Sequence, residues 1–137
     1  RSCSIMSEEF KVEIINPERS FISKDKVTEV VVPAYEGDLG ILKDHISIIS
    51  FLKPGIIKIL EKNEEERYYV EDGIMEFKEN SLSILTSSIH NIKEMKKNSI
   101  DDSLKDAEKL LSNENLDDQE RFLINQKIDV LKSLSIN

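Results

Sequence analysis

Apolar and polar residues alternate along the first two thirds of the chain. Phe10, Val12 and Ile14 are separated by single polar residues, and a similar alternation returns in residues 56–61. In a strand, this period of two places the apolar side chains on one face. Turn-forming residues separate further runs of this kind, at 20–23, 27–32, 46–52, 67–71, 74–78, 82–85 and 88–92. The pattern predicts an antiparallel β-sandwich or flattened barrel of about eight to ten short strands, because each half-apolar sheet must be covered.

The polar segments between these runs predict where the chain turns. Lys24–Lys26 is expected to turn between two strands, and the acidic run 63–66 is expected at a hairpin tip. Asp72-Gly73 is typical of a two-residue hairpin turn. In the centre, Val30–Val32 predicts a strand that Pro33 should end or place at a sheet edge, because proline lacks a backbone donor. The residues that follow predict an exposed acidic loop and then another strand.

After Lys93 the apolar residues recur at helical spacing. Residues 94–99 are polar, and Ser99 is expected to cap the first helix. Its apolar stripe consists of Ile100, Leu104, Ala107, Leu110 and Leu111. A second helix from about Asp117 has an apolar face made of Leu123, Ile124, Ile128, Leu131 and Leu134. The short polar loop between them predicts an antiparallel two-helix hairpin.

The sequence thus predicts an α+β protein in three parts. Residues 1–9 are expected to be a leader or a disordered N-terminus, residues 10–93 a β-sandwich domain, and residues 94–137 a helical hairpin domain. Met6 is interpreted as the native start, so that the preceding residues are a cloning remnant or the end of something longer. Cys3 is the only cysteine, which excludes an internal disulfide and a thiolate metal site.

Composition narrows the classes of function. The 137 residues include 19 basic and 27 acidic side chains, and the formal net charge is −8. Because the cations are interleaved with carboxylates, neither nucleic acid nor an anionic membrane surface is an expected partner. The acidic segment 117–120 likewise disfavours a DNA-reading helix. The longest candidate for a membrane-spanning segment, residues 46–60, is interrupted by charged and turn-forming residues, so direct membrane insertion is not expected.

Two histidines and two loop carboxylates are candidates for chemistry. His45 with Glu36 or Asp38 would suit a small β-sandwich hydrolase or binding module, and His90 is the other histidine. The two carboxylates lie on an exposed loop, without the burial that separates the pKa values of an acid/base pair. The histidines lack the spacing of a metal site, and no glycine-rich lysine loop for nucleotide phosphates is present. We therefore predict neither a catalytic residue nor a metal site.

Four motifs occur together in the order known from one family. They are Phe10–Ile14 with Pro17-Glu18, Val31-Val32-Pro33-Ala34-x-Glu36-Gly37-x-x-Gly40-Ile41-Leu42 with His45, Leu52-Lys53-Pro54-Gly55, and Tyr69–Glu76. With these motifs the chain resembles the ε subunits of bacterial F-type ATP synthase, whose mitochondrial counterpart is called δ. The resemblance is strong from Phe10 to about Leu85. From Ile100 onwards it extends only to the general pattern.

The resemblance implies a non-catalytic rotor subunit of the central stalk, on the cytoplasmic side of the bacterial inner membrane. Such a subunit couples the γ shaft to the c-ring, so that proton transport drives ATP synthesis by other chains. The c-ring contacts implied by the resemblance are Ala34, Tyr35, Glu36, Gly37 and Asp38. The γ-subunit contacts implied in the same way are Asn16, His45 and Ser50. Relatives often have Pro-Gly where this chain has Lys43-Asp44 before the histidine.

For the hairpin, the resemblance implies a regulatory helix that meets the catalytic α and β subunits and inhibits ATP hydrolysis. The basic residues available for this contact are Arg121, Lys127 and Lys132. Some relatives bind ATP through Ile/Leu-Asp-x-x-Arg-Ala at the start of the helical domain. Here Leu104 and Lys105 replace the Arg-Ala pair, which removes the guanidinium fork that grips phosphate oxygens. No cofactor is assigned.

Overall fold

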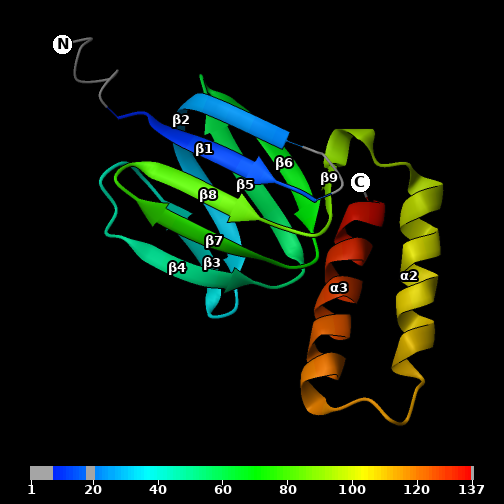
Figure 1. Ribbon diagram of the computed structural model, residues 1–137. Coiled ribbons are helices and arrows are strands. Elements are labelled where there is room, and N and C mark those ends of the chain that lie inside the picture. The colour runs from blue at the N-terminus through cyan, green and yellow to red at the C-terminus, as the bar shows by residue number, and fades with distance from the viewer. Residues whose placement is uncertain (1–7, 18–20, 137) are drawn as a thin grey trace.

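The computed structural model describes residues 8–17 and 21–136, and it shows a β-sandwich followed by two helices (Figure 1). The expectations for Met6, Cys3 and most of the leader lie outside the described residues. The strands are β1 (Phe10–Ile15), β2 (Phe21–Ala34), β3 (Gly37–Ile41), β4 (Ile48–Leu52), β5 (Gly55–Glu61), β6 (Glu64–Val70), β7 (Gly73–Lys78), β8 (Ser81–Leu85) and β9 (Ile89–Asn91). A short 3₁₀ helix, η1 (Ile92–Glu94), leads to α2 (Lys97–Leu111) and α3 (Asp118–Ile136). The predicted α+β class, with a sandwich before a two-helix hairpin, is confirmed.

Strand β2 joins the two layers of the sandwich. Its first half pairs with β1, and its second half pairs with β3 on one edge and β5 on the other. The order β1-β8-β7-β4-β2 closes on itself through the pairing of β1 with β2. Strands β5, β6 and β9 continue from β2 and cover the first layer (Figure 1). The nine-stranded sheet is therefore folded over and closed along one side.

The expected turn at Lys24–Lys26 is wrong, because β2 is a single strand of 14 residues. Its pairing with β1 shifts register between Lys24 and Val27, and its pairing with β5 shifts between Val27 and Glu29. Such bulges bend a strand without ending it, so the polar residues stay within the ladder. The strand ends at Ala34, one residue after Pro33, close to where the proline was expected to end it. The Pro33 carbonyl accepts a hydrogen bond from the Lys53 amide at 3.0 Å.

Three expectations about strand connections also need correction. β1 and β8 pair in parallel, although an antiparallel sandwich was expected throughout. The hairpin tip lies at Lys62-Asn63, whose φ angles are 54° and 67°, so the acidic residues 64–66 belong to β6. Asp72-Gly73 links β6 to β7, and these strands pair with other partners. This link crosses from one layer to the other instead of closing a hairpin.

The main hydrophobic core lies between the layers and is continuous from β1 to β8. Phe77 is fully buried, and the ring of Phe10 packs edge-on against it with centroids 5.5 Å apart. Gly55 marks a close approach of two segments, because a Cβ there would lie 2.5 Å from the Cβ of Pro33. The motif Leu52–Gly55 is thus packed directly against the motif that contains Pro33.

Helix α3 lies against the sandwich, and α2 packs on its outer side (Figure 1). α2 begins at Lys97 with Lys96 as its N-cap residue, so Ser99 lies inside the helix and the expected cap is wrong. At the start of α3, the Asp117 carboxylate accepts from the Glu120 amide at 2.7 Å, and the Glu120 carboxylate accepts from the Asp117 amide at 3.1 Å. This reciprocal capping box fixes where α3 begins. Among the described residues, no helix is long and apolar enough to cross a membrane.

Candidate interaction surfaces

The turn predicted to face the c-ring is a two-residue hairpin at a corner of the sandwich. Ala34 pairs with Gly37, so Tyr35 and Glu36 form the turn between β2 and β3. Gly37 has a φ of 132°, which side chains rarely allow. Tyr35, Glu36 and Asp38 are exposed, whereas Ala34 is buried. The expected order of strand, exposed acidic loop and strand is confirmed, and the turn presents one aromatic ring and two carboxylates.

His45 lies half-buried in the loop between β3 and β4. Its Nδ1 is 2.8 Å from the carbonyl oxygen of Ile46, so Nδ1 carries a proton and donates it to this bond. The His45 ring packs edge-on against Phe77 with centroids 6.1 Å apart. His45 thus contacts a backbone carbonyl and an aromatic ring, and among the described residues it is not paired with Glu36 or Asp38. This geometry anchors a loop to the core, and it does not assemble the pair that a hydrolase would need.

The other two residues expected at the γ subunit are buried. Asn16 is 6% exposed and Ser50 is 9% exposed. Ser50 pairs with the fully buried Met75, which places both on the inner side of the layer. The neighbours of Ser50 in β4 point the other way, and Ile49 and Phe51 are 65% and 63% exposed. The side chains that β4 presents outward are therefore apolar.

Four exposed apolar residues lie next to one another on the outer surface of the layer formed by β1, β8, β7 and β4. Ile15 in β1 pairs with Leu85 in β8, and Leu85 pairs on its other side with Ile74 in β7. Ile74 pairs in turn with Phe51 in β4. We call these four residues the apolar row. Single exposed apolar residues are ordinary, but a contiguous patch is typical of a binding surface for another protein.

A groove of about 800 Å³ includes three members of the apolar row, Phe51, Ile74 and Leu85. Its lining also contains Tyr35 and Glu36 from the exposed turn, and the remaining wall includes Asp72, Ser87 and, from α3, Gln119. The turn and the outer face of the sheet are thus parts of one surface. Sequence reasoning missed the apolar row, although segment 48–52 carries more apolar residues than a half-buried strand needs.

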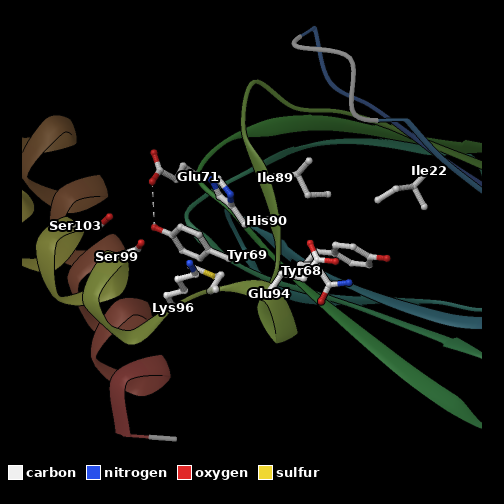
Figure 2. Close-up of a pocket in the computed structure, with 12 residues that line it drawn as sticks. Ile22, Tyr68, Tyr69, Glu71, Ile89, His90, Glu94, Lys96, Ser99 and Ser103 are labelled. Carbon is white, nitrogen blue, oxygen red and sulfur yellow. Dashed lines mark hydrogen bonds between the residues drawn. The ribbon is translucent and has the colours of Figure 1, made fainter.

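A second cavity, of about 770 Å³, lies where the hairpin meets the sandwich (Figure 2). Tyr69 is buried there, and its hydroxyl donates to the Glu71 carboxylate at 3.3 Å. Lys127 of α3 pairs with the same carboxylate oxygen at 3.1 Å. Burial, together with the nearby Glu71 carboxylate, raises the pKa of Tyr69 far above its ordinary value, so the phenol remains a donor. Glu71 therefore ties α3 to the end of β6.

The residues expected to act in the hairpin lie in different surroundings. Lys127 is held by Glu71, Lys132 is exposed, and Arg121 is half-buried in the first turns of α3. Leu104, one of the two residues that depart from the ATP-binding motif of some relatives, packs against the apolar cluster formed by Tyr69, Ile100, Leu131 and Leu134. The side chain at position 104 thus makes an apolar contact inside the protein. Within the part of the chain that the structure describes, no group of three His, Cys, Asp or Glu side chains is placed to hold a metal ion.

Comparison with known proteins assigns the sandwich to a family. Residues 9–92 match the model of the ATP synthase delta/epsilon chain β-sandwich domain. The chain belongs to this family. The ATP synthase epsilon chain of Pelagibacter ubique (strain HTCC1062) is 70% identical over 104 residues, which cover 76% of this chain and 80% of that protein. The ATP synthase epsilon chain of Dichelobacter nodosus (strain VCS1703A) is 36% identical over 107 residues, 77% of this chain and 74% of that one. The resemblance drawn from the four motifs is confirmed.

Solved structures share the fold over both the sandwich and the hairpin. A chain of the Euglena gracilis mitochondrial ATP synthase, in a structure of OSCP/F1/c-ring in rotational state 1, aligns with a TM-score of 0.73 and 18% identity. The alignment covers 93% of this chain and 80% of that chain. A chain of the Tetrahymena thermophila mitochondrial ATP synthase, in a structure of the central stalk and c-ring, aligns with a TM-score of 0.62 and 14% identity. That alignment covers 91% of this chain and 95% of that chain. At these identities the likeness shows the fold alone.

Proposed function

We propose that this chain is a non-catalytic central-stalk subunit of an F-type ATP synthase, which couples the γ subunit to the c-ring during proton-driven ATP synthesis. The observation that carries the proposal is family membership, together with 70% identity to an ATP synthase epsilon chain. The similar folds come from ATP synthase structures with a c-ring. Catalysis belongs to other chains of such a complex, and this chain lies peripherally on the cytoplasmic side of the bacterial inner membrane.

Two adjoining surfaces suit this role. We assign the turn with Tyr35 and Glu36 to the c-ring, and the apolar row, together with His45 in the loop that precedes β4, to the γ subunit. Tyrosine suits an interface because it offers a large apolar body and a polar tip. Asn16 and Ser50 lie below the γ-facing surface, where they shape it from inside. Because the turn and the apolar row share one groove, a single rigid body can touch both partners.

Coupling γ to the c-ring requires a stiff connection between the turn and the apolar row, and the strand pairing provides this connection. Ala34 at the end of β2 pairs with Leu52 at the end of β4. Beside this pair, the Tyr35 amide donates to the carbonyl of Phe51 at 3.2 Å. A force applied to the turn is thus passed to the apolar row through adjacent backbone, above a core that is packed like a solid.

The hairpin is the regulatory part in this proposal. While α3 is docked, Lys127 is paired with Glu71 and faces the sandwich, so an acidic segment of the catalytic subunits cannot engage it. Release of α3 would free Lys127 and uncover the apolar cluster at Tyr69. Two arrangements that differ by a few kcal/mol are sufficient for such a switch.

The test is the binding of the purified chain to its cognate γ subunit, measured by surface plasmon resonance. The double variant Phe51→Ser/Ile74→Ser changes the apolar row without entering the core. We expect its affinity to fall at least about tenfold, since aromatic and aliphatic anchors carry much of the energy of an interface. Leu110→Ser is the matched control, because Leu110 is a comparably exposed apolar residue on α2. A wild-type chain that is folded and fails to bind γ would contradict the proposed function.

A further inference from the structure

The outer face of the β1-β8-β7-β4 layer consists of three parallel rows of different chemistry. The first is the apolar row. Two residues further along each strand, the registers align a second row, which we call the acidic row, of Glu13, Ser83, Glu76 and Ile49. A third row aligns Lys11, Ser81 and Lys78, and we call it the basic row. The rows run across the strands, so a partner that follows them must also cross the strands.

The spacing within the apolar row favours a helix as the partner element. Neighbouring strands lie about 4.8 Å apart, so the four residues span roughly 14 Å. Helix positions i, i+4, i+7 and i+11 lie on one face and span about 16 Å, with about 5.4 Å per turn. A strand laid along the row would place its same-face side chains about 6.7 Å apart, compared with about 4.8 Å between neighbouring residues of the row. Its side chains would therefore no longer align with the row after two residues. One helix of about three turns matches the row.

The charges beside the row specify the flank of that helix. Glu13 and Glu76 of the acidic row lie about 6.7 Å from the apolar row, which is within reach of Lys or Arg on a docked helix. On the other side, the groove is bordered by exposed Asp72 and Glu36. The basic row lies farther out, and Lys78 is 3.9 Å from Glu76. A helix with an apolar face and cationic flanks is therefore complementary to this surface.

We propose that the apolar row receives one amphipathic α-helix of the γ subunit, which lies across strands β1, β8, β7 and β4. Its apolar residues at i, i+4, i+7 and i+11 cover Ile15, Leu85, Ile74 and Phe51 in this order or its reverse. Lys or Arg residues on its flank face Glu13 and Glu76. The inference rests on the proposed function for the identity of the partner, and it adds the secondary structure, direction and charge of the docking element.

Site-directed cross-linking tests the geometry. In a Cys3→Ser background, the full chain is made with one cysteine at a time, as Ile15→Cys, Leu85→Cys, Ile74→Cys or Phe51→Cys, and each is labelled with a maleimide photocross-linker. After illumination of the complex with purified γ, mass spectrometry locates the attached γ residue. We expect four sites within one γ segment, in monotonic order, each three or four residues from the next. Steps of two residues, or sites scattered over several segments, would overturn the inference while γ binding itself persists.

Removal of charges from the same face tests whether the docked helix carries cationic residues on its flank. Glu13→Gln/Glu76→Gln removes two charges of the acidic row, and Lys11→Gln/Lys78→Gln removes two of the basic row as the matched control. At low salt we expect the first variant to bind γ about five- to tenfold more weakly, and the difference to vanish near 0.5 M salt. The control should bind as well as the wild type or better. Equal losses in both variants would overturn the cationic flank. Failure of the unaltered, folded chain to bind γ would count against the proposed function itself.

Discussion

The sandwich and the hairpin of this chain are stabilised in different ways. The sandwich contains its own continuous core, and β1–β2 pairing closes it along one side. The hairpin has a smaller apolar cluster of Ile100, Leu131 and Leu134, and this cluster is completed by Tyr69 from β6. The sandwich can therefore fold around its own residues, whereas the hairpin needs the sandwich. From this difference we expect the hairpin to be able to move without unfolding the sandwich.

The described residues also join the two regions through a polar contact. Among the described residues, the ion pair of Lys127 with Glu71 is the one that joins α3 to the sandwich. A cavity remains beside it, lined by Ser99 and Ser103 of α2 and by His90 of β9 (Figure 2). A junction with a small apolar cluster, a single ion pair and a cavity should open at lower free energy than the core of the sandwich.

The largest effect is expected from Phe77→Ala in the core of the sandwich. Loss of a fully buried ring leaves a cavity and removes the packing against Phe10, which should lower the free energy of unfolding by about 3–5 kcal/mol. Urea unfolding monitored by circular dichroism measures this change in the free energy of unfolding. Phe51→Ala is the matched control in the neighbouring strand, because its ring is exposed and should change stability by less than about 0.5 kcal/mol.

Leu131→Ala should separate the two regions. Leu131 is fully buried in the hairpin cluster, and its truncation should cost about 2–4 kcal/mol of docking energy. We expect amides of α2 and α3 to lose protection in hydrogen exchange, while amides of β4 and β7 keep theirs. Leu110→Ala, at an exposed position, is the control. Equal loss of protection in the helices and the sandwich would mean that the two regions unfold as one unit.

Glu71→Gln tests the ion pair at the junction. The change keeps a partner for the Tyr69 hydroxyl but removes the charge opposite Lys127, so docking should weaken by up to about 1 kcal/mol. Proteolysis of the hairpin should become faster at low salt, and the difference from wild type should shrink in high salt. Glu108→Gln, which removes an exposed carboxylate of α2, is the control. A difference that does not depend on salt would contradict an electrostatic contact.

The smallest effect concerns pH and the sandwich alone. The Lys24 ammonium lies 2.9 Å from Glu66, and its hydrogen bond, followed by that of Tyr68, lowers the pKa of the Glu66 carboxyl. The same hydrogen bond raises the pKa of Lys24 above its usual 10.5. The stabilisation is thus full from about pH 5 to 10, is lost as pH falls through the lowered pKa of Glu66, and is lost as pH rises through the raised pKa of Lys24.

Lys24→Gln should therefore be less stable than wild type by up to about 1 kcal/mol at neutral pH, with a smaller difference near pH 3. Urea unfolding at a series of pH values measures the difference. The control is Lys58→Gln, since Lys58 is an exposed residue of β5 that forms no ion pair with another described residue. A Lys24→Gln difference that stays constant down to pH 3 would contradict the assigned role of Glu66.

The sequence by itself determined the classes of element and where most of them lie. Period-two alternation is a local property, so it located β1 and β5 correctly, and helical spacing located α3. Glycine with a positive φ is also a local requirement, which is why the exposed turn at residues 35–36 could be predicted. The motifs that carry the family resemblance lie in these same segments.

The tertiary structure alone decided how the strands pair and which faces are covered. Lys24–Lys26 remains in a strand because bulges against β1 and β5 bend it, and those partners are distant in sequence. β4 is apolar on both faces, so its pattern could not say whether Ser50 or Phe51 faces outward. The registers of β4 with β7 and of β7 with β8 settle that choice, and they assemble the apolar row from four separate strands. Alternation defines two faces of a strand, but only long-range pairing decides which face is buried.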